Sequence, residues 1–272
     1  CHACGRDSSA QAAMTPAMDS TGQARGGWDA RRVLIVMPTY NEADTLQVSY
    51  AELRGQIPDV NILIVDDNSP DGTGRLADEL CVSNGQTFAL HRTHKEGLGP
   101  AYLAGFAWAL QRDFDFIVEM DADGSHRPHD LARLLDRASA VAEPVLVIGS
   151  RWVSGGQVRN WSLWRRLLSI GGNVYTKVML GLPVNDATAG FRVFSTSALR
   201  SIDRSGVHSA GYCFQIDMTR RAQSAGIAIV EVPIVFVERR AGRSKMSNAI
   251  VAEALWRVTV WGLQRLFIRG SR

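Results

Sequence analysis

Two carboxylates at the end of a short apolar run are the residues of this chain best placed to do chemistry. The run from Phe116 to Met120 is mostly apolar without helical spacing and too short for a helix, so it predicts a buried strand. Asp121 and Asp123 follow directly, separated by Ala122. Alternate residues of an extended segment point the same way, so both carboxylates could hold one hard cation that bridges a diphosphate. The alternative is a pair of solvated turn acids.

The elements that must position this pair come from alternating apolar runs and helical segments. Predicted strands cover 33–37, 61–65, 88–91, 116–120 and 145–148, and predicted helices cover 41–55, 73–81, 97–111 and 128–140. Asn41 is the candidate cap of the first helix. The alternation predicts an α/β fold with a doubly wound, mostly parallel sheet and flanking helices.

Acidic or loop-forming clusters follow three of these predicted strands, beginning at Pro38, Asp66 and Asp121. Ligands of an open α/β sheet gather beyond the carboxyl ends of its strands, so we expect one shared nucleotide site. No Gly-x-Gly-x-x-Gly follows the first strand, and no Gly-x-x-x-x-Gly-Lys-Ser/Thr occurs. Neither a common dinucleotide-binding fold nor a P-loop is expected.

The second half of the chain is more basic and aromatic. Between Arg151 and Lys177 there are five Lys or Arg residues and no acid, interleaved with tryptophans. Segments 211–225 and 227–237 predict a helix and a strand, and 239–245 a basic loop. The last predicted helix, 246–268, is apolar except for a narrow polar stripe. We expect this amphipathic helix to lie in a membrane interface or against a partner, with packing on the sheet as the alternative.

Composition limits the class of protein. The chain has 272 residues, a net charge of +3, 46% apolar and 21% charged residues, which is ordinary for a globular protein and gives no reason to expect nucleic acid. From Arg239 to Arg272 there are eight basic residues and one acid, a local +7, which leaves −4 elsewhere. A basic, apolar tail favours an anionic surface or acceptor. Four cysteines form no disulfide framework, which favours the cytoplasmic side of a membrane.

The domain organisation follows from the same patterns. No uncharged apolar run of 18 residues occurs, so no transmembrane helix is predicted. Residues 1–30 are rich in small and polar types, so we expect a disordered leader. Residues 31–272 are expected to form one domain. Its expected parts are a nucleotide-binding half at 31–150, an acceptor-side half at 151–245 and the amphipathic helix at 246–269.

Several motifs together resemble a known family. They are Pro38-Thr39-Tyr40-Asn41-Glu42, Val65 to Thr73, Asp121-Ala122-Asp123, Ser125-His126-Arg127-Pro128, Gly149-Ser150-Arg151, Asp186 to Arg192, Val232-Pro233-Ile234 and Gly242-Arg243-Ser244-Lys245. The chain resembles the family-2 inverting glycosyltransferases with the GT-A fold, and within them the dolichol- or polyprenol-phosphate mannose synthases. The resemblance covers roughly residues 31–262 and implies transfer of mannose from GDP-mannose to a polyprenyl phosphate with inversion.

The resemblance also implies roles for individual residues on the donor side. The residues that would border the nucleotide are Pro38, Tyr40, Glu42, Val65, Asp67 and the backbone of Ala122. Asp67 or Glu42 would accept guanine N–H groups. Asp121 and Asp123 would hold Mg²⁺ or Mn²⁺ on the diphosphate, with Ser125 as a weak or water-mediated ligand. The metal would stabilise the leaving group as a Lewis acid.

On the acceptor side the resemblance implies phosphate contacts by arginines. A lipid phosphate is already an anionic nucleophile, so no strong general base is needed. Arg151, Arg165 and Arg239 are the candidate ligands of the acceptor phosphate. Arg151, Arg239 and Lys245 are also candidate donor ligands, and the last two would close a loop on the donor. Asp123 and Arg151 are the predicted catalytic residues. We also expect an integral membrane partner protein.

Three other functions remain open on the sequence. The nearest is transfer of glucose or another hexose from a UDP-sugar to the same lipid. A nucleotidyltransferase shares the fold type but would carry a glycine-rich basic loop after the first strand, which Pro38 to Glu42 is not. A catalytically inert binding subunit would not need the acidic pair and the arginines.

Overall fold

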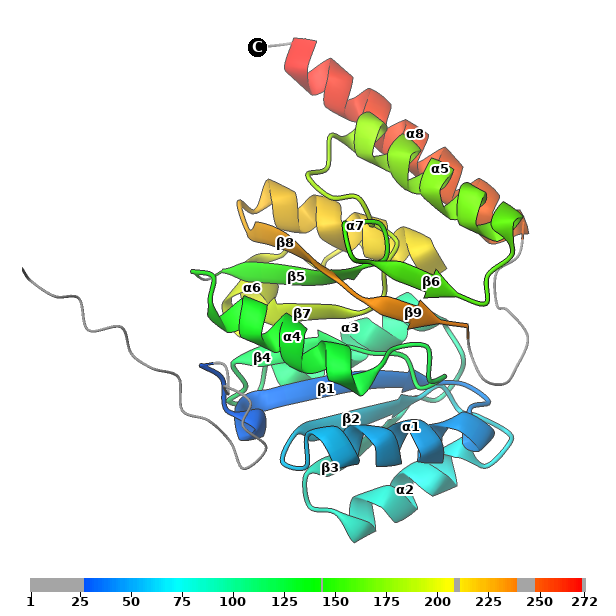
Figure 1. Cartoon of the computed structure of the whole chain (residues 1–272), viewed down its shortest axis with the longest axis vertical. Coiled ribbons are helices and arrows are strands. Elements are labelled where there is room, and N and C mark those ends of the chain that lie inside the picture. Colours follow the sequence, from blue (N-terminus) through cyan, green and yellow to red (C-terminus); the bar gives the residue numbers. More distant parts are fainter. Residues whose placement is uncertain (1–26, 143, 208–210, 239–247, 271–272) are drawn as a thin grey trace, which may run out of the picture.

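The computed structural model describes residues 27–142, 144–207, 211–238 and 248–270 (Figure 1). Most of the expected leader and the whole basic segment with Arg239 and Lys245 lie outside these residues. Trp28, which the leader prediction included, packs against the core, and its indole Nε1 donates to Asp136 Oδ1 at 2.8 Å.

A seven-stranded sheet forms the centre of the described chain, in the order β3-β2-β1-β4-β7-β5-β8. Only β7 runs antiparallel to its neighbours, β4 and β5, so the predicted α/β fold with a mostly parallel sheet is confirmed. The strands are β1 (Val33–Thr39), β2 (Asn61–Asp66), β3 (Thr87–His91), β4 (Phe116–Glu119), β5 (Val145–Ser150), β7 (Arg192–Ser195) and β8 (Ala228–Pro233).

Helices cover both faces of this sheet, which is why the central strands β4, β7 and β5 are buried along their whole length. The helices are α1 (Ala43–Gln56), α2 (Thr73–Ser83), α3 (Leu98–Ala109), α4 (Pro128–Ser139), α5 (Leu163–Leu180), α6 (Thr196–Ser201), α7 (Gly211–Ser224) and α8 (Asn248–Gly270). Buried side chains of α1, α2 and α4 pack on one face, and those of α3, α6 and α7 on the other. A Cβ at Gly105 would collide with Val36, so the glycine allows α3 to lie close against β1.

The second half departs from the sequence prediction in three places. Helix α5 was not predicted, although Ser162 caps its start and Gly181 ends it with φ +60°. The single strand predicted over 227–237 is divided at Ile234, because β9 (Val235–Val237) leaves the main sheet and pairs with β6 (Gln157–Arg159). Asn41 does not cap α1, since Glu42 holds the N-cap position and Asn41 has φ +56°.

Helices α5 and α8 lie side by side at one end of the molecule, far from α2 at the other end (Figure 1). Helix α8 packs on α5 and on α7, and Val258 is buried between them. None of the helices in the described ranges is long and apolar enough to cross a bilayer.

Candidate functional site

The carboxyl ends of β2, β1 and β4 lie next to one another, which brings the three predicted polar clusters to one edge of the sheet. Pro38 faces Val65 in the parallel register of β1 and β2. The N–H of Met120 donates to Val36 O, so the acidic pair begins beside the end of β1. The antiparallel β7 starts at the same edge, and Gly190 before it lies close to Asp121.

Asp66 is a structural residue of the loop after β2. Its Oδ1 accepts from Thr39 Oγ1 at 3.1 Å and from Ser69 Oγ at 2.6 Å, and its Oδ2 accepts from Ser69 N at 3.0 Å. The side chain is buried. Asp66 therefore caps the loop after β2.

Asp71 and Thr73 join that loop to the start of α1. Asp71 Oδ2 accepts from the N–H of Ala43 at 3.2 Å, and Thr73 Oγ1 accepts from the N–H of Glu42 at 3.0 Å. Burial opposes ionisation of Asp71, but hydrogen bonds from Thr73 and Ala43 outweigh it and lower its pKa. The two loops thus form one unit that orients Tyr40 and Glu42 at the edge of the sheet.

Asp67 positions a third loop. It forms an ion pair with Arg92, whose Nη1 lies 2.5 Å from Asp67 Oδ1, and its Oδ2 accepts from the N–H groups of Glu96 and Gly97. The Asp67 side chain is only 5% exposed. Glu42, the other predicted acceptor for a nucleobase, also has a partner within the chain, because its Oε2 accepts from Thr45 Oγ1 at 3.0 Å.

Tyr40 lies at the same place, half-buried, with Lys95 Nζ 3.8 Å from its ring centroid. Such a cation–π pair fixes a flat aromatic surface and a positive charge side by side. Lys95 was not singled out by the sequence analysis, since a lysine in a loop carries no local signal of its neighbour.

The acidic pair is held by buried neighbours. Tyr102 Oη donates to Asp121 Oδ1 at 3.2 Å, and His126 Nδ1 accepts from the Asp121 N–H at 3.1 Å. The Asp123 carboxylate, only 4% exposed, accepts from the N–H of Ser125 at 3.0 Å. His126 also stacks on Phe191 with ring centroids 4.8 Å apart, so its role is to hold the loop.

Two further contacts concern the predicted ligands around this pair. Ser49 Oγ donates to Ala122 O at 2.9 Å, which fixes the peptide between the aspartates. Ser125 Oγ is buried and has no hydrogen-bond partner among the described residues. An orphaned hydroxyl next to two carboxylates fits a hard oxygen-seeking cation, directly or through water. Among the described residues, no group of three His, Cys, Asp or Glu side chains that could hold a metal ion is found.

A buried polar cluster lies beneath Asp121. Glu119 is fully buried, and burial raises its pKa to about 7 against the charge of Arg192, whose Nε is 4.0 Å away. Arg192 donates to backbone carbonyls of Ala187, Ala189 and Gln215. The cluster ties the segment 186–192 to the end of β4.

Arg151 is held by a buried carboxylate. Its Nε and Nη2 each lie 2.7 Å from an oxygen of Asp186, and its Nη2 also donates to Thr188 Oγ1. Both members of the pair are buried, and Asn173 of α5 donates to Thr188 Oγ1. Arg151, the predicted phosphate ligand, is therefore held in a fixed orientation. Its partner Asp186 had no predicted role.

Arg165 lies nearby at the start of α5. Its guanidinium stacks over Trp161 at 4.2 Å and its Nη1 lies 2.6 Å from Glu238 Oε1. The structure brings Arg151 and Arg165 to the wall of the same cavity, whereas the predicted contributions of Arg239 and Lys245 lie outside the described residues.

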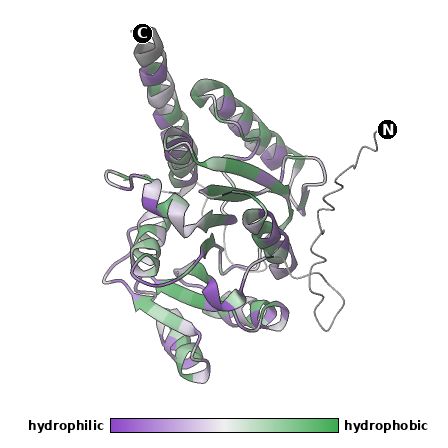
Figure 2. Cartoon of the chain, turned by 90° about the vertical axis from the view of Figure 1, so that its left-hand side faces the viewer, coloured by the Kyte–Doolittle hydropathy of each residue, from purple (hydrophilic) through white to green (hydrophobic). Residues whose placement is uncertain are grey.

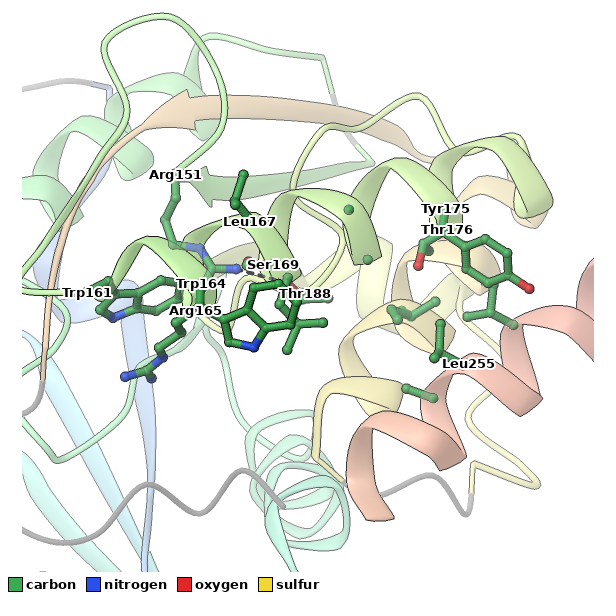
Figure 3. A pocket seen from close by; sticks show the side chains of 16 residues that line it. Arg151, Trp161, Trp164, Arg165, Leu167, Ser169, Tyr175, Thr176, Thr188 and Leu255 are labelled. Carbon is green, nitrogen blue, oxygen red and sulfur yellow. Dashed lines mark hydrogen bonds between the residues drawn. The ribbon is translucent and has the colours of Figure 1, made fainter. Parts of the chain in front are cut away.

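That cavity has a volume of about 500 Å³ and runs between α5 and α8 (Figure 3). Arg151, Arg165 and two tryptophans lie at one end, and Tyr175, Thr176 and Leu255 at the other. The lining between them is largely apolar. This arrangement suits a molecule with an anionic head and an apolar chain.

The same helices also expose large apolar side chains, four of which (Trp164, Leu167, Leu168 and Leu255) line the cavity as well. The exposed large apolar side chains on α5 and α8 are Leu163, Trp164, Leu167, Leu168, Ile170, Val174, Val178, Leu255, Trp256 and Leu263. Hydrophobic and hydrophilic residues are interspersed along both helices where they project from the body of the molecule (Figure 2). A group of exposed apolar side chains of this kind is typical of a contact with a membrane or a protein.

Comparison with known proteins establishes the family. The model described as glycosyl transferase family 2 matches residues 34–203, and the chain belongs to this family. The chain is 51% identical to the polyprenol monophosphomannose synthase of Mycolicibacterium smegmatis, over 86% of this chain and 88% of that protein. It is also 51% identical to the undecaprenyl-phosphate mannosyltransferase of Micrococcus luteus, over 85% of this chain and 94% of that protein.

A solved structure shows the same fold. Glucosyl-3-phosphoglycerate synthase from Mycobacterium tuberculosis, in complex with Mn²⁺, UDP and glucosyl-3-phosphoglycerate, matches with a TM-score of 0.58 and 19% identity. The match covers 88% of this chain and 84% of that one. The predicted GT-A type of fold is thereby confirmed.

Proposed function

We propose that this protein transfers mannose from GDP-mannose to a polyprenyl phosphate, with inversion at the anomeric carbon, and depends on Mg²⁺ or Mn²⁺. The observation that carries the proposal is the cavity between α5 and α8, which has Arg151 and Arg165 at one end and apolar side chains beyond them. It supports an acceptor with a phosphate head and an apolar chain. The names of the two relatives at 51% identity support the same acceptor and sugar.

The residues of the chain would divide the chemistry as follows. Arg151, held rigidly by Asp186, and Arg165 would neutralise and orient the acceptor phosphate, whose oxygen is already a nucleophile. Asp121 and Asp123, with Ser125, would hold the metal, which when bound supplies charge stabilisation for the departing diphosphate. Since the nucleophile arrives ionised, the site needs no side chain to remove a proton.

The identity of the nucleobase in the sugar donor is the more specific part of the proposal. Tyr40 and Lys95 offer a flat surface with a cation, and Glu42 lies beside them at the end of β1. A carboxylate that accepts two N–H groups would favour guanine over uracil. UDP-glucose or another UDP-hexose is the rival donor, because the structural relative in complex with UDP has the same fold.

The deciding experiment offers radiolabelled GDP-mannose and UDP-glucose separately with undecaprenyl phosphate, with and without chelator. We expect lipid-linked product from GDP-mannose alone, loss of product with EDTA and recovery with Mn²⁺ or Mg²⁺. Asp123→Asn should show no transfer while keeping the wild-type unfolding midpoint. Product from UDP-glucose alone would refute GDP-mannose as the donor. Release of pyrophosphate would indicate a nucleotidyltransferase.

We also propose that the protein works on the cytoplasmic face of a membrane, bound at its surface, beside an integral membrane partner. The exposed apolar side chains of α5 and α8 support contact with lipid or with such a partner. Contact with lipid and contact with a membrane partner would each bring the mouth of the cavity to the layer where a polyprenyl phosphate resides.

A further inference from the structure

Two adjacent glycines, Gly171 and Gly172, lie in the middle of helix α5. Glycine is an unfavourable residue in a helix interior, and close packing usually explains it. No atom of the described residues lies within 4 Å of a Cβ placed on either glycine. By contrast, a Cβ on Gly262 of α8 would lie 2.7 Å from Met179 Cε. Packing inside the chain therefore explains Gly262 and leaves the pair in α5 unexplained.

Both glycines line the cavity that begins at the two arginines. Arg165, Ser169, Gly172 and Thr176 all contribute to its wall, at spacings of four, three and four residues, so they share one face of α5. This face spans about 16 Å at a rise of about 1.5 Å per residue. The glycines, which carry no side chain, thus lie along the same side of α5 as the predicted phosphate ligand Arg165, and C-terminal to it.

The character of the wall changes along this face. Arg151 and Arg165 make one end cationic, no side chain projects from the wall at the two glycines, and Leu255 lies at the far end (Figure 3). Exposed apolar side chains of α5 and α8, such as Leu167 and Leu255, also line the cavity. A linear molecule with an anionic head and a long apolar chain matches this order in charge and in shape.

We propose that Gly171 and Gly172 form the passage by which the isoprenoid units nearest the phosphate cross helix α5, and that they determine which acceptors the enzyme admits. This inference rests on the proposed function for the identity of the acceptor. A side chain at either glycine would project into the cavity and narrow it. The acceptor chain would be obstructed, while the donor site at the ends of β1, β2 and β4 would be unaffected.

The test compares Gly171→Leu, Gly172→Leu and the milder Gly171→Ala and Gly172→Ala with wild-type protein. Alanine favours the helix, so these variants keep the test valid if a leucine variant fails to fold. Gly55→Leu is the matched control, because Gly55 is an exposed glycine of helix α1 with no described atom within 4 Å of its Cβ position. Farnesyl phosphate binding is followed by tryptophan fluorescence, since Trp161 and Trp164 line the cavity. Michaelis constants for undecaprenyl phosphate and GDP-mannose are measured in parallel.

We expect the leucine variants in α5 to weaken farnesyl phosphate binding and raise the KM for undecaprenyl phosphate by about tenfold or more, with smaller effects for alanine. The KM for GDP-mannose and the properties of Gly55→Leu should not change. Unchanged lipid binding in folded leucine variants would overturn the inference, as would wild-type protein that binds no farnesyl phosphate. Wild-type protein that binds farnesyl phosphate but transfers no mannose would overturn the proposed function alone.

Discussion

Asp121 and Arg151 are each held by a buried side chain from a distant part of the chain. Tyr102 of α3 orients the Asp121 carboxylate, and Asp186 orients the Arg151 guanidinium. Groups held in this way lose little freedom when a metal or a phosphate binds. The effects of replacing the holding residue and the held residue therefore differ, and the difference can be measured.

Tyr102→Phe removes one hydroxyl from a fully buried ring that stacks on Phe214. We expect the Mn²⁺ concentration for half-maximal transfer to rise by about tenfold, because an outer hydrogen bond to the proposed metal ligand is lost. Activity at saturating Mn²⁺ should largely recover. Tyr50→Phe is the control, since it removes a buried hydroxyl bonded to Thr87 away from the site. An equal metal requirement in both variants would contradict the role of Tyr102.

Arg151→Ala and Arg165→Ala should separate stability from acceptor binding. Loss of Arg151 leaves Asp186 as an unpaired buried carboxylate, which costs about 3–5 kcal/mol of unfolding free energy. Arg165 is partly exposed, and its pair with Glu238 contributes about 1 kcal/mol or less. Urea unfolding should show this contrast, while both variants raise the KM for polyprenyl phosphate. Equal stability loss would be inconsistent with the buried pair as described.

Helix α8 has apolar side chains on two sides. Val258 is only 1% exposed and Trp261 packs against the core, whereas Trp256 is 70% exposed. Glu253 and Arg257 form an ion pair that is about one-third exposed, with N and O atoms 2.9 Å apart. Both charges act on the pKa of Cys213 in α7, which indicates that this pair lies on the α7 side. Part of the apolar surface of α8 is thus buried against the protein, and the rest faces outward.

Val258→Asp should separate α8 from α7 and make Cys213 reactive. Burial raises the pKa of Cys213 to about 12, so its thiol is neutral and slow to react at pH 8 in the folded protein. If a charge at the buried Val258 admits water, this pKa falls toward its ordinary value and the thiolate fraction at pH 8 rises. Alkylation of the Cys213 peptide, followed by mass spectrometry, should accelerate in Val258→Asp. Trp256→Asp places the same charge on the outer side and should leave the rate unchanged.

The molecule as a whole is polarised along its long axis. The end formed by α5 and α8 exposes apolar side chains, and the end formed by α2 and β3 belongs to the half of the chain that is predicted to bind the nucleotide (Figures 1 and 2). The cavity opens between these two helices, so a surface bound there would meet the proposed acceptor site directly. If the proposed function holds, this geometry would couple attachment to a membrane with access to the lipid substrate.

Trp164→Glu combined with Trp256→Glu should weaken vesicle binding. Both tryptophans are at least 70% exposed, and replacing them removes apolar surface and adds negative charge where anionic lipid would approach. Cosedimentation with phosphatidylglycerol vesicles should fall by about tenfold or more. Val82→Glu on α2, where Val82 is 92% exposed, is the matched control and should sediment like wild type. Full vesicle binding by the double variant would exclude this end as the membrane-facing surface.

The sequence by itself determined the alternation of strands and helices, the edge at which polar clusters gather and the acidic pair that ends β4. These features are local, because an apolar run or a turn motif within a few residues favours one conformation. It also supplied enough motifs to indicate the family. Helix α5 could also have been predicted, since Ser162 and Gly181 mark its ends. Its basic and aromatic residues interrupt the helical spacing of apolar residues, so the segment was not identified as a helix.

Only the tertiary structure decided which side chains hold which. Three such pairs join residues far apart in the sequence. Asp186 lies 35 positions from Arg151, Tyr102 lies 19 from Asp121, and Arg92 lies 25 from Asp67. No local pattern encodes such pairs, because their distance depends on how whole elements pack. Which apolar side chains of α8 are buried and which are exposed was decided in the same way. Which face of a helix is buried depends on the surface that its neighbours present.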